Sequence, residues 1–397
     1  MPELIPFRWP VEWKDASRLE ILKGTPINCL VGDAPPPFST GDLAFFPKDQ
    51  LPAGIAVREG TWPRVLPAQT KKDAAEAGAT GAAWVDSNAG LIRLAQTMEP
   101  GKPVWLTTLP PGGKEVVPLE EFARAVAEAC AYRARWIVAL DGPFRAEIEK
   151  RSEAGLREWK RVAAALNLFE RHSEWRNWEP AAALAVVSDF EGDNKLMAEE
   201  FLILAPRRHL AYRAIRKADA GKATLSGFKA ILWLDGAPPA GALRDQCLEF
   251  AQAGGLLISP RGVVAGDPSE TFFDYQIHRL GKGRVAVPKE AWYDPFLLVA
   301  GVQLLIGNRD NVVQVWNGGS MNSHVLASEK NDRAVAHLIH YSSGRSQPVT
   351  LGFSKPYRSA RVCTLDSEKV VRPVRGGIGI EVPVGEFSGY AAVELEA

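Results

Sequence analysis

The chain has 397 residues, of which 46% are hydrophobic and 24% are charged, and its 47 Lys and Arg balance its 47 Asp and Glu. This length exceeds one ordinary domain and fits two or three. A formal charge of zero gives no argument for the basic surface that neutralises phosphates, so no nucleic-acid partner is expected. No stretch approaches the roughly 20 apolar residues of a membrane helix, so no membrane partner is expected either.

The first residues, Met1 to Trp13, contain prolines and charged residues but no apolar segment of the kind found in a signal peptide. The sequence as given thus contains no signal peptide, which leaves export open and the cytoplasm as the default location. Four cysteines stand far apart among apolar neighbours: Cys29, Cys130, Cys247 and Cys363. No two have CxxC spacing, so we expect buried thiols rather than a zinc site, a redox pair or a disulfide framework.

Short β-branched or aromatic runs alternate with amphipathic segments in the first part of the chain. The runs of strand length are Ile27–Val31, Gly54–Val57, Ala82–Val85, Val104–Leu106 and Trp136–Leu140. The helical patterns between them are Asp73–Ala77, Leu91–Met98 and Leu119–Tyr132. Strands separated by helices need crossover connections, so they are predicted to be mostly parallel.

The clearest of these helices is Leu119–Tyr132. Its apolar residues fall on one face, opposite the charged residues Glu120, Glu121, Arg124 and Glu128. Pro118 precedes it, where a missing N–H costs little. The pattern is that of an amphipathic helix with a polar outer face.

A complete eight-fold (β/α) barrel takes about 250 residues, more than this part of the chain supplies. We therefore predict an incomplete or shortened TIM-type (β/α) barrel over residues 1–178. A long amphipathic helix, from Gly155 to Trp178, closes this region, and Pro180 marks the boundary.

A second α/β unit is predicted over residues 179–310. Its strand-like runs are Ala181–Val187, Tyr212–Ile215, Phe228–Leu234 and Gly255–Ser259, and its helical patterns are Leu196–Ala205 and Ala240–Ala253. Four strands with helices between them indicate a small flavodoxin-like domain. A short helix over Asp294–Gly307 follows, with Pro295 in its first turn.

The last part, residues 311–397, has regular short strands without helices, which indicates a β-sandwich. The expected strands are Ala334–His340, Val349–Phe353, Ala360–Thr364, Gly379–Val384 and Ala391–Leu395.

Short motifs in all three parts support one resemblance. They are Trp84-Val85-Asp86-Ser87-Asn88 and Pro103-Val104-Trp105-Leu106, then Val186-Val187-Ser188-Asp189-Phe190 and Gly254-Gly255-Leu256-Leu257-Ile258, then Leu280-Gly281-Lys282-Gly283-Arg284 and His337-Leu338-Ile339-His340-Tyr341. In this order of parts the chain resembles glycoside-hydrolase-like proteins related to the family 42 β-galactosidases.

The resemblance implies a catalytic barrel, a trimerisation domain similar to a class I glutamine amidotransferase, and a small β domain. It also implies a carbohydrate substrate or ligand and a homotrimer. The chain departs from the family in its shorter (β/α) region, on which no paired catalytic glutamates are evident.

Active sites of (β/α) barrels lie at the carboxyl ends of the strands. The charged and amide residues just past the predicted strands are Asp33, Arg58, Glu59, Asp86, Asn88 and Asp141. Glycosidic cleavage needs one carboxylic acid to protonate the leaving oxygen and one carboxylate as nucleophile or base. We predict Glu59 and Asp141 as the catalytic pair and Asp86 as its third member. The predicted substrate ligands are Asp33, Arg58 and Asn88, together with Trp62 and Phe144 as rings that stack on sugar faces.

The same residues also have a structural explanation. Asp and Asn after a strand are good helix N-caps, and Asp86-Ser87-Asn88 directly precedes a predicted helix. Capping of the helix is therefore an alternative explanation for Asp86. Trp84 and Trp105 lie within predicted strands and are expected to fill the core.

A glutaminase of the amidotransferase fold needs a cysteine on a sharp strand-to-helix turn, activated by a histidine. No cysteine follows a predicted strand of the second unit, and Cys247 lies inside a helical pattern, so this activity is not expected. The six histidines show no metal-binding spacing, and no metal or other cofactor is expected. Two functions remain open: a glycoside-hydrolase-like enzyme, or a catalytically degenerate carbohydrate-binding or oligomeric scaffold protein.

Overall fold

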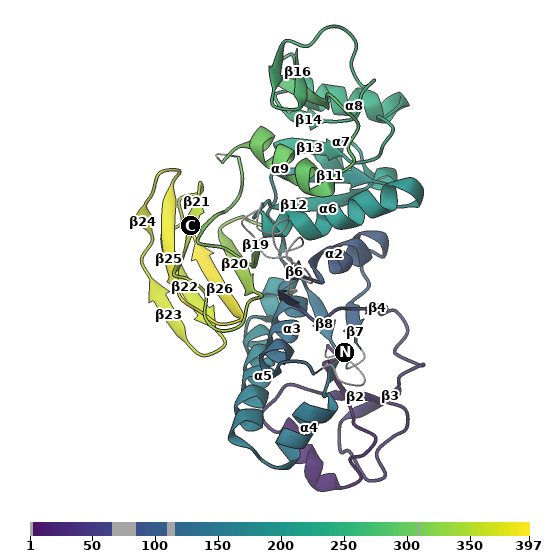
Figure 1. The fold of residues 1–397 in the computed structure, drawn as a ribbon, viewed down its shortest axis with the longest axis vertical. Coiled ribbons are helices and arrows are strands. Elements are labelled where there is room, and N and C mark those ends of the chain that lie inside the picture. Colours follow the sequence, from purple (N-terminus) through teal and green to yellow (C-terminus); the bar gives the residue numbers. More distant parts are fainter. Residues whose placement is uncertain (1–2, 66–84, 109–115, 309) are drawn as a thin grey trace, which may run out of the picture.

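The computed structural model describes residues 3–65, 85–108, 116–308 and 310–397. Figure 1 shows three lobes: the N-terminal part at one end, a sheet with its helices at the other, and the C-terminal strands at their side. The predicted helix Asp73–Ala77 and all but the last residue of the predicted strand Ala82–Val85 lie outside the described residues.

The N-terminal lobe contains two small parallel sheets. One has the order β3-β2-β1-β9, with β1 Pro6–Arg8, β2 Cys29–Gly32, β3 Ala44–Pro47 and β9 Val138–Ala139. The other has the order β4-β7-β8, with β4 Ala56–Glu59, β7 Val104–Thr107 and β8 Ala134–Trp136. Only Ile137 separates β8 from β9, and its N–H donates to the Leu106 carbonyl at 2.9 Å, so one sheet continues into the other.

The strands thus follow one another in the order β4-β7-β8/β9-β1-β2-β3. Within the described ranges no pairing joins β3 to β4, so these strands form an open arc rather than a closed ring. The strands expected at Ile27, Gly54, Val104 and Trp136 are confirmed. Strands β1 and β3 were not predicted, because each is short and carries a proline.

Four helices pack on this arc: α2 Ala89–Met98, α3 Leu119–Ala131, α4 Gly142–Glu149 and α5 Glu153–Arg171. Ser152 is the N-cap of α5, and its hydroxyl accepts a hydrogen bond from the Gly155 N–H at 3.0 Å. The predicted helix to Trp178 was too long, since α5 ends at Arg171 and the 3₁₀ helix η2, Ser173–Asn177, follows. A separate antiparallel pair joins β5 Arg64–Val65 to β6 Val85–Asp86.

The second lobe is one sheet of order β12-β11-β13-β14-β17-β16-β15, parallel as far as β17 and then antiparallel. Its strands are β11 Leu184–Ser188, β12 Tyr212–Arg216, β13 Ala230–Trp233, β14 Leu256–Ile258, β15 Glu270–Phe272, β16 Tyr275–Leu280 and β17 Gly283–Pro288. Its helices are α6 Lys195–Arg207, α7 Lys222–Leu225, α8 Gly241–Gln252 and α9 Pro295–Ile306. The four predicted strands and the helices α6, α8 and α9 are confirmed. Both faces of the sheet carry buried apolar side chains, which explains the continuous apolar runs.

The C-terminal lobe has two antiparallel sheets, of orders β10-β19-β20-β26-β22-β23 and β18-β21-β25-β24. The strands of the first are β10 Glu179–Pro180, β19 Met321–Ala327, β20 Arg333–His340, β22 Ser359–Thr364, β23 Glu368–Val371 and β26 Tyr390–Glu396. Those of the second are β18 Gln314–Trp316, β21 Val349–Phe353, β24 Val374–Arg375 and β25 Ile380–Gly385. All five expected strands are confirmed. Residues Glu179 and Pro180, placed in the second unit from the sequence, pair instead with β19.

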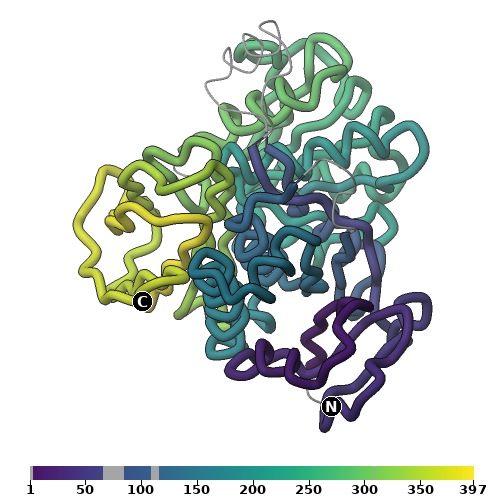
Figure 2. Tube along the Cα trace, turned by 60° about the horizontal axis from the view of Figure 1, so that its bottom comes forward, coloured from purple at the N-terminus to yellow at the C-terminus, as the bar shows by residue number. Residues whose placement is uncertain are grey.

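The six-stranded sheet is covered on both sides. One face shares a core with the four-stranded sheet. The other shares a core with α3 and α5 through residues such as Tyr341, Cys363 and Tyr390. Figure 2, turned from the first view, again shows α5 beside the C-terminal strands. Among the described helices none is both long and apolar enough to cross a bilayer.

Candidate functional site

The strands of the N-terminal arc are parallel, so their carboxyl ends lie at one edge. Glu59 ends β4 there, Thr108 follows β7, and Asp141 follows β9. The Thr108 hydroxyl donates to the Gly60 carbonyl at 2.7 Å, which fixes the segment after β4 against β7. This strand-end edge is the place where the sequence predicted the active site.

Asn88 ties the segment after β6 to the same edge. Its side-chain oxygen accepts from the Thr61 N–H at 2.8 Å, and its amide nitrogen donates to the Thr61 carbonyl at 2.9 Å. Glu59 lies two residues before Thr61, and Asp86 lies two residues before Asn88. The two hydrogen bonds between Thr61 and Asn88 therefore bring the segments that carry these carboxylates together. Asn88 is the N-cap residue of α2, but its side chain makes no cap hydrogen bond. The Asn88 side chain therefore holds the Thr61 backbone in place at the strand-end edge instead of capping α2.

Glu59 and Asp86 have different surroundings. Glu59 is exposed at the end of β4. Asp86 is partly buried and stands opposite Arg64 in the β5–β6 pair. Burial raises the pKa of the Asp86 carboxyl, while the charge of Arg64 opposes the rise. A carboxyl with a raised pKa holds its proton at higher pH, as a general acid requires.

Asp141 is the N-cap of α4, as the structural explanation expected for residues of this kind. Its Oδ1 accepts from the Phe144 N–H at 2.7 Å, and the side chain is 3% exposed. Its Oδ2 is buried and accepts no hydrogen bond from the described residues. One carboxylate oxygen thus has a structural role, and the other is enclosed by protein rather than open to a ligand.

The two predicted sugar platforms are buried. Trp62 is 7% exposed and packs on Phe122 and Trp136, with ring centroids 4.8 and 5.1 Å away. Phe144 is 0% exposed and lies 4.6 Å from the Phe122 ring. Stacking on a sugar needs an open ring face, so the prediction for these two rings does not fit the structure. They form an aromatic cluster, Trp62, Phe122, Trp136 and Phe144, that supports the strand-end edge.

The remaining predicted ligands are engaged in ion pairs. Asp33 is exposed and pairs with Lys48 at 2.5 Å. Arg58 pairs with Glu99, just past the carboxyl end of α2. The structure therefore brings the segments that carry Glu59 and Asp86 together through Thr61 and Asn88 and places Asp141 just after β9. Asp33 and Arg58 have ion-pair partners of their own.

Behind the edge lies a buried carboxylate that the sequence did not single out. Glu128 of α3 is 0% exposed and accepts from the Ser87 hydroxyl at 2.8 Å, the Asn88 amide at 2.8 Å and the Tyr341 hydroxyl at 2.5 Å. Burial raises the pKa of this carboxyl, against the lowering effect of these hydrogen bonds. The hydrogen bond from Asn88 links Glu128 to the strand-end edge.

The charged residues of α3 were predicted to lie on a polar outer face, and this prediction was wrong for three of the four. Glu121, Arg124 and Glu128 are all buried. The C-terminal lobe covers part of this face, since Arg124 donates to the Ser342 carbonyl at 3.2 Å and Glu128 accepts from the Tyr341 hydroxyl. Arg124 also donates to the Pro63 carbonyl of the N-terminal lobe at 3.0 Å. The helical periodicity of the sequence shows which face of a helix is apolar. It cannot show that another lobe of the protein covers the polar face as well.

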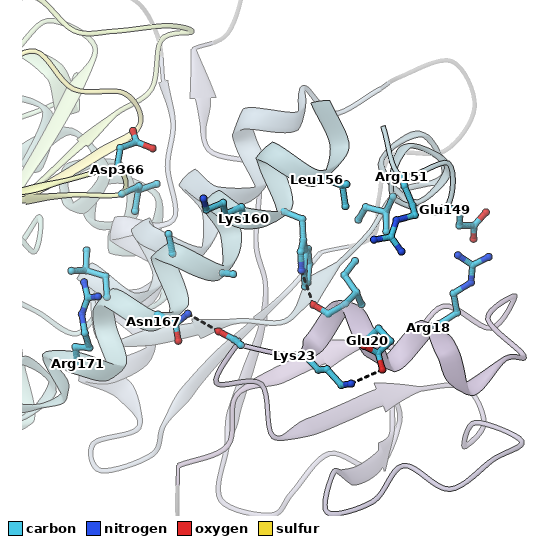
Figure 3. Close-up of a pocket in the computed structure, with 18 of the residues that line it drawn as sticks. Arg18, Glu20, Lys23, Glu149, Arg151, Leu156, Lys160, Asn167, Arg171 and Asp366 are labelled. Atoms are coloured by element: carbon cyan, nitrogen blue, oxygen red, sulfur yellow. Dashed lines mark hydrogen bonds and ion pairs between the residues drawn. The ribbon is translucent and has the colours of Figure 1, made fainter. Parts of the chain in front are cut away.

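A groove of about 1100 Å³ runs along α5, away from the strand-end edge. Figure 3 shows cationic and acidic side chains from separate elements around it: Arg18, Glu20, Lys23, Glu149, Arg151, Lys160, Arg171 and Asp366. Two hydrogen bonds join its walls, from the Trp159 indole to the Ile21 carbonyl and from the Asn167 amide to the Gly24 carbonyl, both at 2.8 Å. The groove has mixed charge and lies on the helical side of the arc.

Comparison by sequence gives no match: no family model and no curated protein resembles the chain. Comparison by structure does. The chain is similar to a catalytic mutant of Gan42B, a GH42 β-galactosidase from G. stearothermophilus, with a TM-score of 0.53 and 11% identity over 93% of this chain and 64% of the other. It is also similar to a β-galactosidase from Bacillus circulans sp. alkalophilus, with a TM-score of 0.53 and 11% identity over 86% and 60%.

A third neighbour is α-L-fucosidase isoenzyme 2 from Paenibacillus thiaminolyticus, with a TM-score of 0.53 and 12% identity over 78% of this chain and 62% of the other. The chain thus spans less than two thirds of the length of these enzymes. At such identity the likeness concerns the fold alone. The chain has a GH42-like architecture.

Proposed function

We propose that this chain is a glycoside-hydrolase-like protein that acts on carbohydrate at the strand-end edge, through the carboxylates Glu59, Asp86 and Asp141. The observation that carries the proposal is the GH42-like architecture, which extends over 93% of the chain. In that architecture the parallel strands present their carboxyl ends at one edge, and in barrel enzymes catalytic residues occupy such edges.

The carboxylates suit different roles in this proposal. Asp86 suits the role of the general acid, because burial raises its pKa and so keeps the proton on the carboxyl at higher pH. Glu59 is exposed and could approach a sugar from solvent as the nucleophile or base. Asp141 has one oxygen, Oδ2, without a hydrogen-bond partner among the described residues; because that oxygen is buried, its contact with a sugar requires the edge to open when the sugar binds.

The proposal includes the division of the chain. Residues 1–178 would be a shortened TIM-type barrel, supported by the arc of parallel strands. Residues 179–310 would be a flavodoxin-like domain related to the class I amidotransferases, supported by the strand order β12-β11-β13-β14-β17. Cys247 is buried within α8, so nothing in this domain supports a glutaminase role for it. Residues 311–397 would be a β-sandwich, supported by the shared core of the two antiparallel sheets.

The test of the function is turnover of a panel of nitrophenyl glycosides that includes β-galactosides and α-fucosides. Glu59→Gln, Asp86→Asn and Asp141→Asn remove one carboxylate each, and Asp245→Asn on the exposed side of α8 is the matched control. We expect loss of an acid or base to slow turnover by at least about 100-fold, with the control unchanged.

Asp141→Asn is informative because Asn is as good an N-cap as Asp, so the start of α4 is kept. Turnover that all three variants retain would refute the assigned residues. An absence of turnover on every sugar, with carbohydrate still bound, would replace hydrolysis by carbohydrate binding.

The GH42-like architecture also leads us to propose a homotrimer. Helix α9 is apolar on nearly all sides, and Leu297 and Leu304 on it are about half exposed. Exposed apolar groups of this size on one helix suit an interface with another copy. Sedimentation equilibrium should give three times the chain mass, and Leu297→Asp with Leu304→Asp should lower it; a monomeric parent would contradict the trimer.

A further inference from the structure

Three side chains of metal-binding type meet where the end of α5 reaches the six-stranded sheet. His172, Cys363 and Glu394 each offer one donor atom, and these three atoms lie within 4.8 Å of one another. We propose that they form a binding site for a divalent transition-metal ion of the zinc class. This inference is independent of the proposed action on carbohydrate.

The fold explains why residues so far apart in the chain converge. Strands β22 and β26 are antiparallel, with Cys363 opposite Ala392 and Arg361 opposite Glu394. Because side chains two residues apart on a strand share a face, Cys363 and Glu394 lie on the same face. The core that Cys363 joins includes residues of α3 and α5, and His172 is the C-cap residue directly after α5.

Glu394 is already held in position. Its Oε1 lies 3.1 Å from Nδ1 of His172 and accepts from the Trp175 indole at 3.2 Å. Trp175 also stacks on the His172 ring, with centroids 4.3 Å apart. Outer contacts of this kind orient metal ligands and limit the entropy lost when an ion binds.

The distances suit a tetrahedral ion after a small adjustment. Zinc binds sulfur at about 2.3 Å and nitrogen or oxygen at about 2.0–2.2 Å, so ligand atoms of a tetrahedral site stand about 3.3 to 3.8 Å apart. A largest separation of 4.8 Å therefore needs a contraction of about 1 Å. The Cys363 side chain is fully buried and those of His172 and Glu394 are 12% and 13% exposed, which leaves a path from solvent. Three protein ligands leave the fourth position for water.

The charges also balance. A thiol binds zinc as a thiolate, so binding releases a proton, and the thiolate and the Glu394 carboxylate then neutralise the two charges of the ion. A neutral site is compatible with Arg333 and Arg361, whose nitrogens lie 3.9 Å from Glu394.

Cobalt(II) is the probe for the test, because thiolate ligation gives it a charge-transfer absorption in the near ultraviolet. The full chain, freed of metal with a chelator, is titrated with cobalt(II) and then with zinc(II). We expect one equivalent of cobalt to bind with this absorption, and zinc to displace it. Zinc should also raise the unfolding temperature, because the ion binds the native state.

The variants are Cys363→Ala and His172→Gln, and the matched control is Cys247→Ala, another buried free cysteine. Loss of a ligand should weaken binding by more than about 100-fold, since even outer-shell partners cost about 10- to 100-fold. The control should bind like the parent. If Cys363→Ala does not fold, His172→Gln still decides, because His172 lies at the rim of the site. Cobalt that does not bind the parent, binds without thiolate absorption, or binds both variants as tightly as the parent would overturn the proposal.

Discussion

The Tyr341 hydroxyl donates a hydrogen bond of 2.5 Å to Oε1 of Glu128, and both side chains are fully buried. Glu128 lies on α3, and Tyr341 follows β20 in the C-terminal lobe. The same carboxylate accepts from Asn88, which holds the Thr61 backbone at the strand-end edge. The C-terminal lobe therefore helps to fix the edge at which we propose the chemistry.

Tyr341→Phe tests that connection. The change removes one hydroxyl and leaves a buried carboxylate oxygen short of a donor, so the free energy of unfolding should fall by about 1 to 3 kcal/mol. Urea denaturation of both proteins measures the difference. Tyr293→Phe, at a ring that is 80% exposed, should change stability little. Equal effects of the two substitutions would show that the Tyr341–Glu128 contact contributes nothing.

The pH dependence of stability should show the raised pKa of Glu128. Because burial raises its pKa above the ordinary value of 4.5, the native state holds this proton more tightly than the unfolded chain. Stability contributed by the protonated group is present below pH 4.5 and is lost as pH rises through the folded-state pKa, by up to about 1.4 kcal/mol per pH unit.

Glu128→Gln removes this titration. The free energy of unfolding of the parent, minus that of the variant, should therefore fall as pH rises above 4.5. Denaturation series at several pH values measure this difference, in which other titrating groups cancel. A difference that stays constant or rises with pH would contradict the raised pKa.

His337 should act in the opposite direction. Burial, with the charges of Arg93 and His172, lowers its pKa from 6.5 to about 3, while its ring nitrogen Nδ1 lies 2.7 Å from the Tyr390 hydroxyl. The unfolded chain then binds the proton more readily, so stability is lost as pH falls from 6.5 toward 3, by up to about 1.4 kcal/mol per unit. His337→Asn should lower stability at pH 7 and make the decline between pH 6.5 and 5 shallower. A parallel decline in both proteins would place the acid sensitivity elsewhere.

The cap of α4 separates the structural from the chemical role of Asp141. Asp141→Ala removes the hydrogen bond to the Phe144 N–H and should cost about 1 kcal/mol of stability, while Asp141→Asn keeps the cap and should cost little. Thermal unfolding of both variants measures this. Equal losses would mean that the cap bond is not what Asp141 contributes.

The elements that could be predicted from the sequence have a local cause. Strand β21 has the predicted bounds, Val349–Phe353, because its run is apolar and bounded by turns. Strand β19 was missed although all its residues are buried, because Asn322, Ser323 and His324 interrupt its apolar pattern. Each of the three makes a tertiary contact: the Asn322 amide donates to the Tyr341 hydroxyl at 2.9 Å, the Ser323 hydroxyl lies 3.1 Å from Nδ1 of His209, and the His324 ring contacts the Arg93 guanidinium.

The candidate site shows the same limit. Parallel strands placed Glu59 and Asp141 at one edge, which the alternation of strands and helices could predict. The burial of Trp62 and Phe144 could not be predicted, because it depends on Phe122 of α3 packing between them. The convergence of His172, Cys363 and Glu394 depends on the register in which β22 pairs with β26, and on α5 packing against these strands. No spacing in the sequence reveals either of them.

A crystal structure with a bound sugar or a hydrolase inhibitor tests the central claim most directly. We expect the anomeric carbon to lie at the strand-end edge, within contact of two of Glu59, Asp86 and Asp141. Their carboxyl groups should stand about 5–5.5 Å apart for a retaining mechanism or about 6.5–9.5 Å for an inverting one. A sugar bound in the groove along α5, with the edge empty, would contradict the claim.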